Sequence, residues 1–151
     1  MAKEIERKFL VTDNSFKDLA INTIEISQGY LSVDADRTVR VRIYGDSAFL
    51  TVKTRNVGAI RNEWEYEIPL VDAQHMLDTA AINRLSKTRF IVPANDGLFW
   101  EVDCFHGNLE GLVVAEIELP RENTFFVKPS FIGREVTGDP FYYNSNLATQ
   151  A

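Results

Sequence analysis

Glu4-Ile5-Glu6-Arg7-Lys8 stands at the start of the chain, with charged residues at alternate positions. Successive side chains of a strand point to opposite faces, so Glu4, Glu6 and Lys8 would share one face. On a single strand such a face would be interpreted as a face in water, because charged residues are mostly exposed. The pattern recurs along the chain, however, and this recurrence decides the fold.

Seven further segments are expected to be strands, most of them with one charged and one apolar face. They are residues 23–31, 38–43, 49–54, 61–68, 86–92, 98–105 and 114–119. An amphipathic helix is expected over 73–81, with Asp72 as its cap. The tail is expected to be helical over 129–136 and again from Pro140 through Leu147, with Asp139 as the second cap.

Composition limits the class of protein. A length of 151 residues predicts one domain, 1–151, which includes a helical tail at about 129–148. The net charge of −6 argues against duplex nucleic acid as a partner. Cys104 is the single cysteine, which fits a reducing compartment. With no signal peptide and no long apolar run, we expect a cytoplasmic protein without a membrane partner.

Two structures satisfy the alternation. One is an open antiparallel sheet with a wet charged face and a helix-covered apolar face. The other is a closed barrel with charged residues in its lumen and apolar residues outside. An eight-stranded barrel has an interior about wide enough for one small ligand. The alternation by itself leaves both structures open.

Charges of the same sign sit two residues apart on several strands. The pairs are Arg40 with Arg42, Lys87 with Arg89, Glu4 with Glu6, Glu63 with Glu65, and Glu116 with Glu118. Like charges on one face repel, and a solvated sheet gains nothing from them. A ligand with many negative oxygens together with divalent cations would use both signs of charge. From these residues alone, wet sheet and ligand-lined barrel remain about equally supported.

An ordered series of motifs resembles the CYTH domain, or triphosphate tunnel metalloenzyme, superfamily. The series is Glu4-x-Glu6-x-Lys8, Arg40-x-Arg42, Thr51-x-Lys53, Arg61-x-Glu63-x-Glu65, Lys87-x-Arg89, Asp103 and Glu116-x-Glu118. Residues 131–139 also resemble the bacterial members, which usually have Trp where this chain has Phe131. The resemblance covers effectively the whole chain. It implies a mainly β (α+β) fold, an eight-stranded antiparallel closed β-barrel tunnel with a charged lumen and a few flanking helices.

The resemblance also implies the roles of residues. The expected triphosphate-binding residues are Lys8, Arg40, Arg42, Lys53, Lys87 and Arg89, with Arg134 adding a cation at one end of the tunnel. The expected ligands of one or two Mg²⁺ or Mn²⁺ ions are Glu4, Glu6, Asp103, Glu116 and Glu118, with Glu63 and Glu65 shared between metal and water positioning. Glu4 and Glu6 are expected to be essential for turnover, and Lys87 is the expected proton acceptor.

The function implied by the resemblance is metal-dependent hydrolysis of tripolyphosphate to pyrophosphate and phosphate. Alternatives within the family are a CYTH-type adenylate cyclase and a thiamine triphosphatase. A sensor module that binds polyphosphate or nucleotide without turnover is the non-enzymatic alternative, although every expected carboxylate is present. Eight outward apolar faces exceed what these few helices can cover, so a homodimer is also expected.

Overall fold

The computed structural model describes residues 3–151, which form nine strands and a few short helices. The strands are Lys3–Val11 (β1), Asn22–Asp34 (β2), Arg37–Tyr44 (β3), Ser47–Lys53 (β4), Ile60–Ile68 (β5), Asn83–Pro93 (β6), Phe99–Phe105 (β7), Val113–Glu118 (β8) and Ile132–Glu135 (β9). The helices are Phe16–Leu19 (α1), Leu70–Thr79 (α2) and Asn144–Leu147 (α3), with 3-10 turns at Asn95–Gly97, Gly107–Leu109, Pro140–Tyr142 and Ala148–Gln150.

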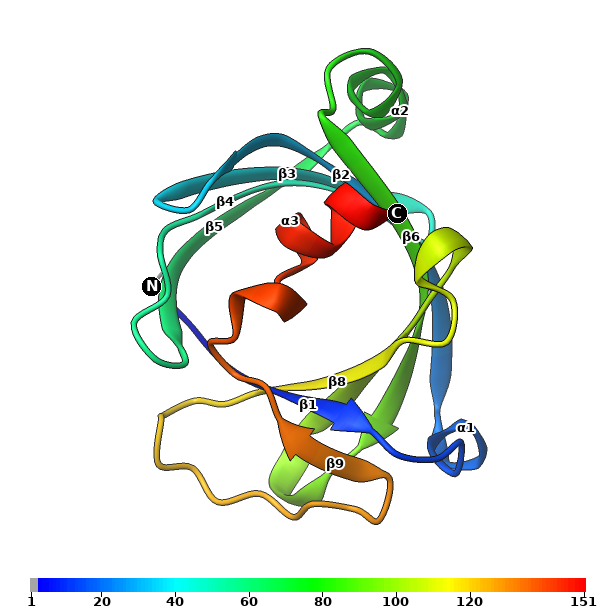
Figure 1. Ribbon diagram of the computed structural model, residues 1–151, viewed down its shortest axis with the longest axis vertical. Helices are drawn as coiled ribbons and strands as arrows, with labels where there is room; N and C mark the ends of the chain where they lie inside the picture. The colour runs from blue at the N-terminus through cyan, green and yellow to red at the C-terminus, as the bar shows by residue number, and fades with distance from the viewer. Residues whose placement is uncertain (1–2) are drawn as a thin grey trace.

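The strands form one antiparallel sheet that closes on itself. Their order is β5-β4-β3-β2-β6-β7-β8-β1-β9, with an additional pairing between β5 and β1. The start of β1 closes the ring, because Glu4 lies opposite Arg61 of β5 while Lys8 lies opposite Glu116 of β8. Figure 1 looks into this ring, with β9 attached to the second half of β1. The predicted closed eight-stranded barrel is therefore confirmed.

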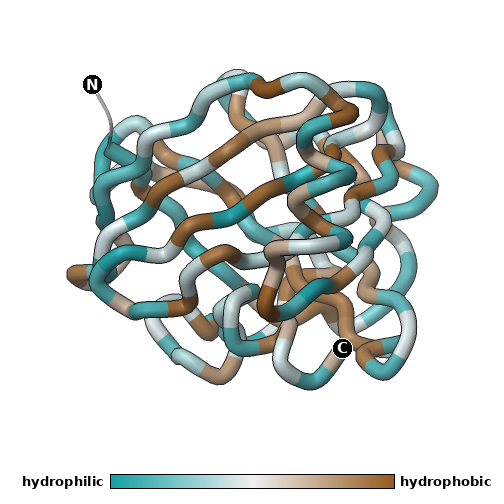
Figure 2. Tube along the Cα trace, turned by 90° about the horizontal axis from the view of Figure 1, so that it is seen from above, coloured by the Kyte–Doolittle hydropathy of each residue, from teal (hydrophilic) through white to brown (hydrophobic). Residues whose placement is uncertain are grey.

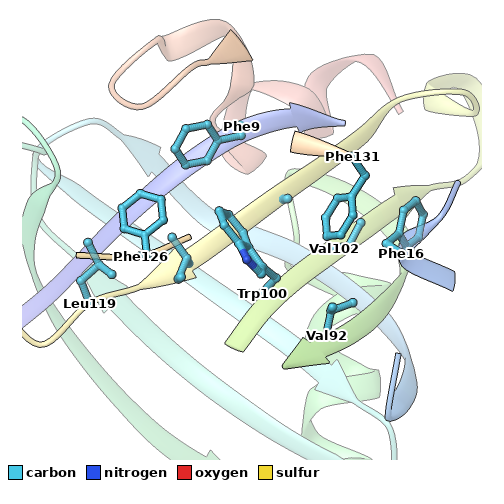
Figure 3. Close-up of a cluster of buried hydrophobic side chains, with 10 residues drawn as sticks. Phe9, Phe16, Val92, Trp100, Val102, Leu119, Phe126 and Phe131 are labelled. Atoms are coloured by element: carbon cyan, nitrogen blue, oxygen red, sulfur yellow. The ribbon is translucent and has the colours of Figure 1, made fainter. Parts of the chain in front are cut away.

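The wall of the barrel separates charged from apolar residues, and hydrophilic and hydrophobic positions alternate along its strands (Figure 2). The main apolar cluster lies outside β1, β7 and β8, under the loop between β8 and β9. Phe9, Trp100 and Phe126 meet there edge to face, with ring centres 5.6 to 6.0 Å apart (Figure 3). The hydrophobic core is thus on the outer side of the wall, and the lumen is left to polar groups.

Helix α2 covers the outer face beside β3 and β4. Its buried residues Ala73 and Leu77 pack with Val41 and Ala48. The helix also lies close to β2, because a Cβ built on Gly29 would come within 2.8 Å of a Leu77 methyl carbon. It begins at Leu70, directly after Pro69, instead of after Asp72 as expected. Among residues 3–151, no helix has both the length and the apolar character needed to cross a bilayer.

The tail differs from its prediction at one end and agrees at the other. The helix expected over 129–136 is wrong, because Ile132–Glu135 pairs with β1 as β9. Arg134 consequently lies on an exposed strand. Beyond it, Asp139 caps a helical turn by accepting a hydrogen bond from Phe141 N, as expected. The helical turns then enter one end of the ring (red in Figure 1).

Apolar side chains close that end of the barrel. Leu147 and Ala148 of the tail are buried against residues of five strands, namely Leu10, Tyr30, Leu85, Phe105 and Val114. We call this the closed end. The open end is the opposite one, lined by Glu101 and Glu118.

The outer wall also has exposed aromatic residues. On β5, Trp64 is 40% exposed and Tyr66 is 63% exposed. The expected homodimer would cover such residues, and it stays a prediction.

Trp100 provides a test of where the core lies. Its ring is completely buried, so Trp100→Ala should lower the free energy of unfolding by about 3–5 kcal/mol. Trp64→Ala is the matched control and should cost much less, because Trp64 is partly exposed. Urea unfolding followed by far-UV circular dichroism measures both values. Equal losses would contradict the placement of the core outside β1, β7 and β8.

Candidate active site

The ring encloses a cavity of about 280 Å³ whose lining is mostly charged. All eight strands of the ring and the tail contribute to it. The lining residues are Glu4, Glu6, Lys8, Tyr30, Thr38, Arg40, Arg42, Tyr44, Phe49, Thr51, Lys53, Arg61, Glu63, Glu65, Arg89, Glu101, Glu116, Glu118, Tyr143, Asn144 and Ser145. The side-chain period of two explains why residues two apart in the sequence meet here.

Strand register pairs opposite charges on one wall. Glu4 lies opposite Arg61, and Lys53 lies opposite Glu63. Lys53 Nζ is 3.1 Å from a Glu4 carboxylate oxygen and 3.3 Å from one of Glu63, while Arg61 Nε is 3.3 Å from Glu4. Although burial raises it, the charges of Lys53 and Arg61 hold the pKa of Glu4 below its usual value. This wall is therefore neutralised within itself.

The opposite wall is built around a buried arginine. Arg89 lies opposite Asp103 in the register and donates two hydrogen bonds to it, of 2.8 and 3.0 Å. Its guanidinium also lies 3.2 Å from Glu101 and 3.6 Å from Glu116. Burial lowers the pKa of Arg89, but Asp103 and Glu101 outweigh it and raise the pKa above its usual value. Arg89 is thus a permanent charge that lines the cavity.

Lys87 lies behind this wall. Its side chain has no exposed surface, and its Nζ is 2.7 Å from an Asp103 oxygen. Burial, helped by the charges of Arg89 and Arg42 and opposed by Asp103, lowers the pKa of Lys87 to about 7. Lys87 Nζ also donates a hydrogen bond of 2.8 Å to Asn144 Oδ1. Asn144 lines the cavity and Lys87 does not, so the tail amide covers the lysine.

Two arginines of β3 are less well neutralised. Arg42 Nε donates to Gln28 Oε1 at 2.8 Å, and no carboxylate among residues 3–151 lies within 4.0 Å of its guanidinium. Burial first, and then Arg40 and Arg89, lower the pKa of Arg42 to about 10. Arg40 is 3.5 Å from Glu65, and its buried Nε has no partner among the described residues. This part of the lumen favours an anion.

The carboxylates gather toward the open end. Burial raises the pKa of Glu6 well above its usual value, and Glu116 and Glu4 raise it further. Glu116 keeps a low pKa in spite of its burial, because Lys8 and a hydrogen bond from Glu6 stabilise its charge. Desolvation and the charges of Glu4, Glu63 and Glu101 raise the pKa of Glu118 to about 7. Negative charge is crowded in this region.

The expected site residues fall into three groups. The cavity-lining ones are Glu4, Glu6, Lys8, Arg40, Arg42, Lys53, Glu63, Glu65, Arg89, Glu116 and Glu118. Lys87 and Asp103 are buried behind the lining and bind each other. Arg134 is exposed on β9, outside the lining, because its segment is a strand and not a helix.

Other lining residues were not predicted from the sequence. Glu101 shares a strand face with Asp103, so the period of two could have revealed it. Tyr143, Asn144 and Ser145 come from the tail, where no motif marks them.

Glu118 allows a test of the crowded carboxylates. Its raised pKa means that proton binding stabilises the ligand-free fold fully below about pH 4.5, and that this stabilisation is lost as the pH rises through about 7. Glu118→Gln should therefore raise the melting temperature at pH 8, with a smaller gain at pH 5. Thermal unfolding in a chelator measures this gain, and Glu110→Gln, at an exposed position outside the cavity, is the control. A gain in melting temperature that is the same at both pH values would contradict the crowding of carboxylates around Glu118.

Comparison with known proteins agrees with this architecture. Residues 2–143 match the CYTH domain family. The inorganic triphosphatase of Acetivibrio thermocellus is 49% identical over 148 residues, which cover 97% of this chain and 94% of that protein. The inorganic triphosphatase of Nitrosomonas europaea is 35% identical over 148 residues, which cover 96% of each. A crystal structure of an inorganic triphosphatase superposes with a TM-score of 0.68 at 31% identity, covering 100% of this chain and 97% of that one. From its motifs, its closed barrel and these matches, the chain belongs to the CYTH domain family.

Proposed function

We propose that this chain hydrolyses inorganic tripolyphosphate to pyrophosphate and phosphate. The observation that carries the proposal is the pair of incompletely neutralised arginines, Arg40 and Arg42, inside the cavity that the ring encloses. Two relatives named inorganic triphosphatase, 49% and 35% identical along nearly the whole chain, support the same substrate.

The arginine pair suits a polyanion. Arg42 is buried with only a neutral partner, Gln28, and its positive charge is held near that of Arg40. Cations held close together in a medium of reduced dielectric repel each other, and a bound anion relieves that repulsion. Guanidinium groups also match phosphoryl oxygens in geometry. We therefore place the phosphoryl chain against β3.

Four further cations line the cavity but already have carboxylate partners. Lys8 is 3.6 Å from Glu116, while Lys53 and Arg61 are 3.1 and 3.3 Å from Glu4. Arg89 is shared between Asp103 and the glutamates beside it. A triphosphate that binds Lys8 and Lys53 would replace these partners. Among the described residues, Glu4 would then keep only Arg61, and Glu116 only Arg89, as a cation within 4 Å, which adds negative charge to the crowded carboxylate region.

A divalent cation would bind to Glu4 and Glu116 once Lys53 and Lys8 have turned to the substrate. Hard cations such as Mg²⁺ or Mn²⁺ prefer carboxylate oxygens. Neighbouring carboxylates raise the pKa of Glu6 and of Glu118, and a bound cation would relieve this repulsion between negative charges. We propose that one or two such ions are held by Glu4, Glu6, Glu63, Glu116 and Glu118. When bound, the ion would neutralise phosphoryl charge and polarise water. Among residues 3–151, no three acidic, histidine or cysteine side chains already form a metal-binding group.

Asp103 and Glu65 are left out of this proposed metal site. Both oxygens of Asp103 are held by Arg89, and one is also held by Lys87. Glu65 accepts a hydrogen bond of 2.9 Å from Thr51 and lies beside Arg40. We propose that both carboxylates orient lumen cations.

The reaction transfers a phosphoryl group to water. A water oxygen forms a bond to the terminal phosphorus, the bond to the bridging oxygen breaks, and pyrophosphate leaves with that electron pair. The proton of the water must pass to a base. Lys87 has a suitable pKa of about 7, but its Nζ is separated from the cavity by Asn144. It could accept the proton only through an intervening group, and its role as the base stays a prediction.

An organic triphosphate is a second candidate substrate, favoured by one observation. A second hollow of about 440 Å³ adjoins the open end and shares Glu101 and Glu118 with the cavity. Its apolar lining includes Ile91, Leu98 and Phe99. The base of ATP or the rings of thiamine triphosphate could pack there. Product analysis with tripolyphosphate, ATP and thiamine triphosphate, each with Mg²⁺ or Mn²⁺, separates the candidates, including a cyclase.

Glu6→Gln tests the proposed metal site. The variant keeps the shape of the side chain but removes a carboxylate, so turnover of tripolyphosphate with saturating Mg²⁺ should fall about 100-fold or more. Phosphate release measures turnover, and circular dichroism checks the fold. Glu122→Gln, outside the cavity, is the control. Activity near that of the wild type would remove Glu6 from the metal site.

Tripolyphosphate should stabilise the protein without turnover. In a chelator, a concentration one hundred times the dissociation constant adds about 2.7 kcal/mol to the free energy of unfolding. For a chain of this size the gain corresponds to about 5–11 °C in melting temperature. Arg42→Met should shrink the shift. A shift no larger than that from sodium chloride at equal ionic strength would overturn the anion site.

A further inference from the structure

We propose that Asn144 is a substrate-binding residue, whose side-chain amide donates a hydrogen bond to the phosphoryl group at the closed end of the cavity. The proposal rests on the proposed triphosphatase function and adds a residue that none of the strand motifs contains.

The orientation of the amide is fixed by its partners. Asn144 Oδ1 accepts hydrogen bonds from Lys87 Nζ at 2.8 Å and from Gln28 Nε2 at 3.3 Å. Arg42 can only donate, so Gln28 turns its oxygen to Arg42 and its NH2 group to Asn144. The oxygen and not the nitrogen of the Asn144 amide therefore faces Gln28 and Lys87. Asn144 Nδ2 donates to no protein acceptor among residues 3–151. It is also not one of the fully buried polar atoms that lack a hydrogen-bond partner. Because Asn144 lines the cavity, its two N–H groups are available to a ligand there.

Both neighbours of the amide are themselves anchored. Gln28 is completely buried, and its Oε1 accepts a hydrogen bond from Arg42. Lys87 is completely buried and bound to Asp103. Hydrogen bonds therefore connect Asn144 to Arg42 through Gln28, and directly to Lys87. A donor held in this way loses little freedom when it binds substrate.

The closed end suits a terminal phosphoryl group. Two lumen cations are connected to the tail through uncharged groups. Lys8 Nζ donates to the Tyr142 carbonyl at 3.0 Å, and Arg42 donates to Gln28, which donates to Asn144. The crowded carboxylates lie toward the other end. Lys8 and Arg42 then offer positive charge to the terminal phosphoryl group, and the Asn144 amide offers N–H donors.

Two substitutions separate substrate binding from simple docking of the tail. Asn144→Asp keeps the size of the side chain and both acceptor functions, so the tail should stay docked, but it replaces the N–H donors with a charged oxygen. Asn144→Leu removes the acceptor as well and should loosen the tail more. Asn146→Leu is the matched control, because Asn146 is exposed and its Nδ2 donates only within the tail, to the Pro140 carbonyl.

Titration calorimetry with tripolyphosphate in a chelator measures binding to each full-length variant, and phosphate release with Mg²⁺ measures turnover. We expect Asn144→Leu to weaken binding about 10-fold, Asn144→Asp to weaken it further because of added repulsion, and Asn146→Leu to leave it unchanged. Melting temperatures should fall in a different order, with Asn144→Asp more stable than Asn144→Leu.

Three results would overturn the proposal. If Asn144→Leu binds like the wild type, the amide does not contact the ligand, because the repulsion of a carboxylate alone would weaken binding to Asn144→Asp. If Asn144→Leu binds more weakly than Asn144→Asp, or if Asn146→Leu is equally impaired, Asn144 only docks the tail. In these cases wild-type turnover still supports the triphosphatase function. A wild type that neither binds nor hydrolyses tripolyphosphate would instead remove that function, and the role of Asn144 with it.

Discussion

The structure depends on the need to neutralise charges that the fold turns inward. Once the ring closes, the glutamates, lysines and arginines of its strands lie at close range and partly out of water, where unpaired charge is costly. Register meets this need on both walls, since Glu4 faces Arg61 and Arg89 faces Asp103. Register does not meet it everywhere: Arg42 is held by a neutral amide, and Glu6 lies opposite Glu118. An anionic ligand would bind at the first of these places and a cation at the second.

The strands could be predicted because the information for each of them is local and repeated. Each strand is marked by its own alternation, and every expected strand is present within three residues of its predicted ends. The alternation could not distinguish an open sheet from a ring, because both bury one face. The ordered motifs made that distinction. Most expected lumen residues, such as Arg40 and Glu116, indeed line the cavity, since their orientation follows from the period of two.

The tail could not be predicted, because its conformation is decided by distant partners. Residues 132–135 become a strand because the second half of β1 offers them an edge, and tertiary pairing outweighs a local preference for helix. Asn144 has no motif around it and reaches the lumen only through the docking of Leu147 and Ala148. Lys87 was placed on the correct face, but no motif indicates that a tail amide covers it.

The closed end also affects how substrate enters and products leave the enzyme. While Leu147 and Ala148 stay docked at that end, substrate and both products pass through the open end. When the phosphoryl group that is cleaved is the innermost one, pyrophosphate lies between the detached phosphate and solvent and must depart first. When it is the outermost one, phosphate departs first. The order of release therefore follows from which end of the bound tripolyphosphate is cleaved, and not from affinity alone.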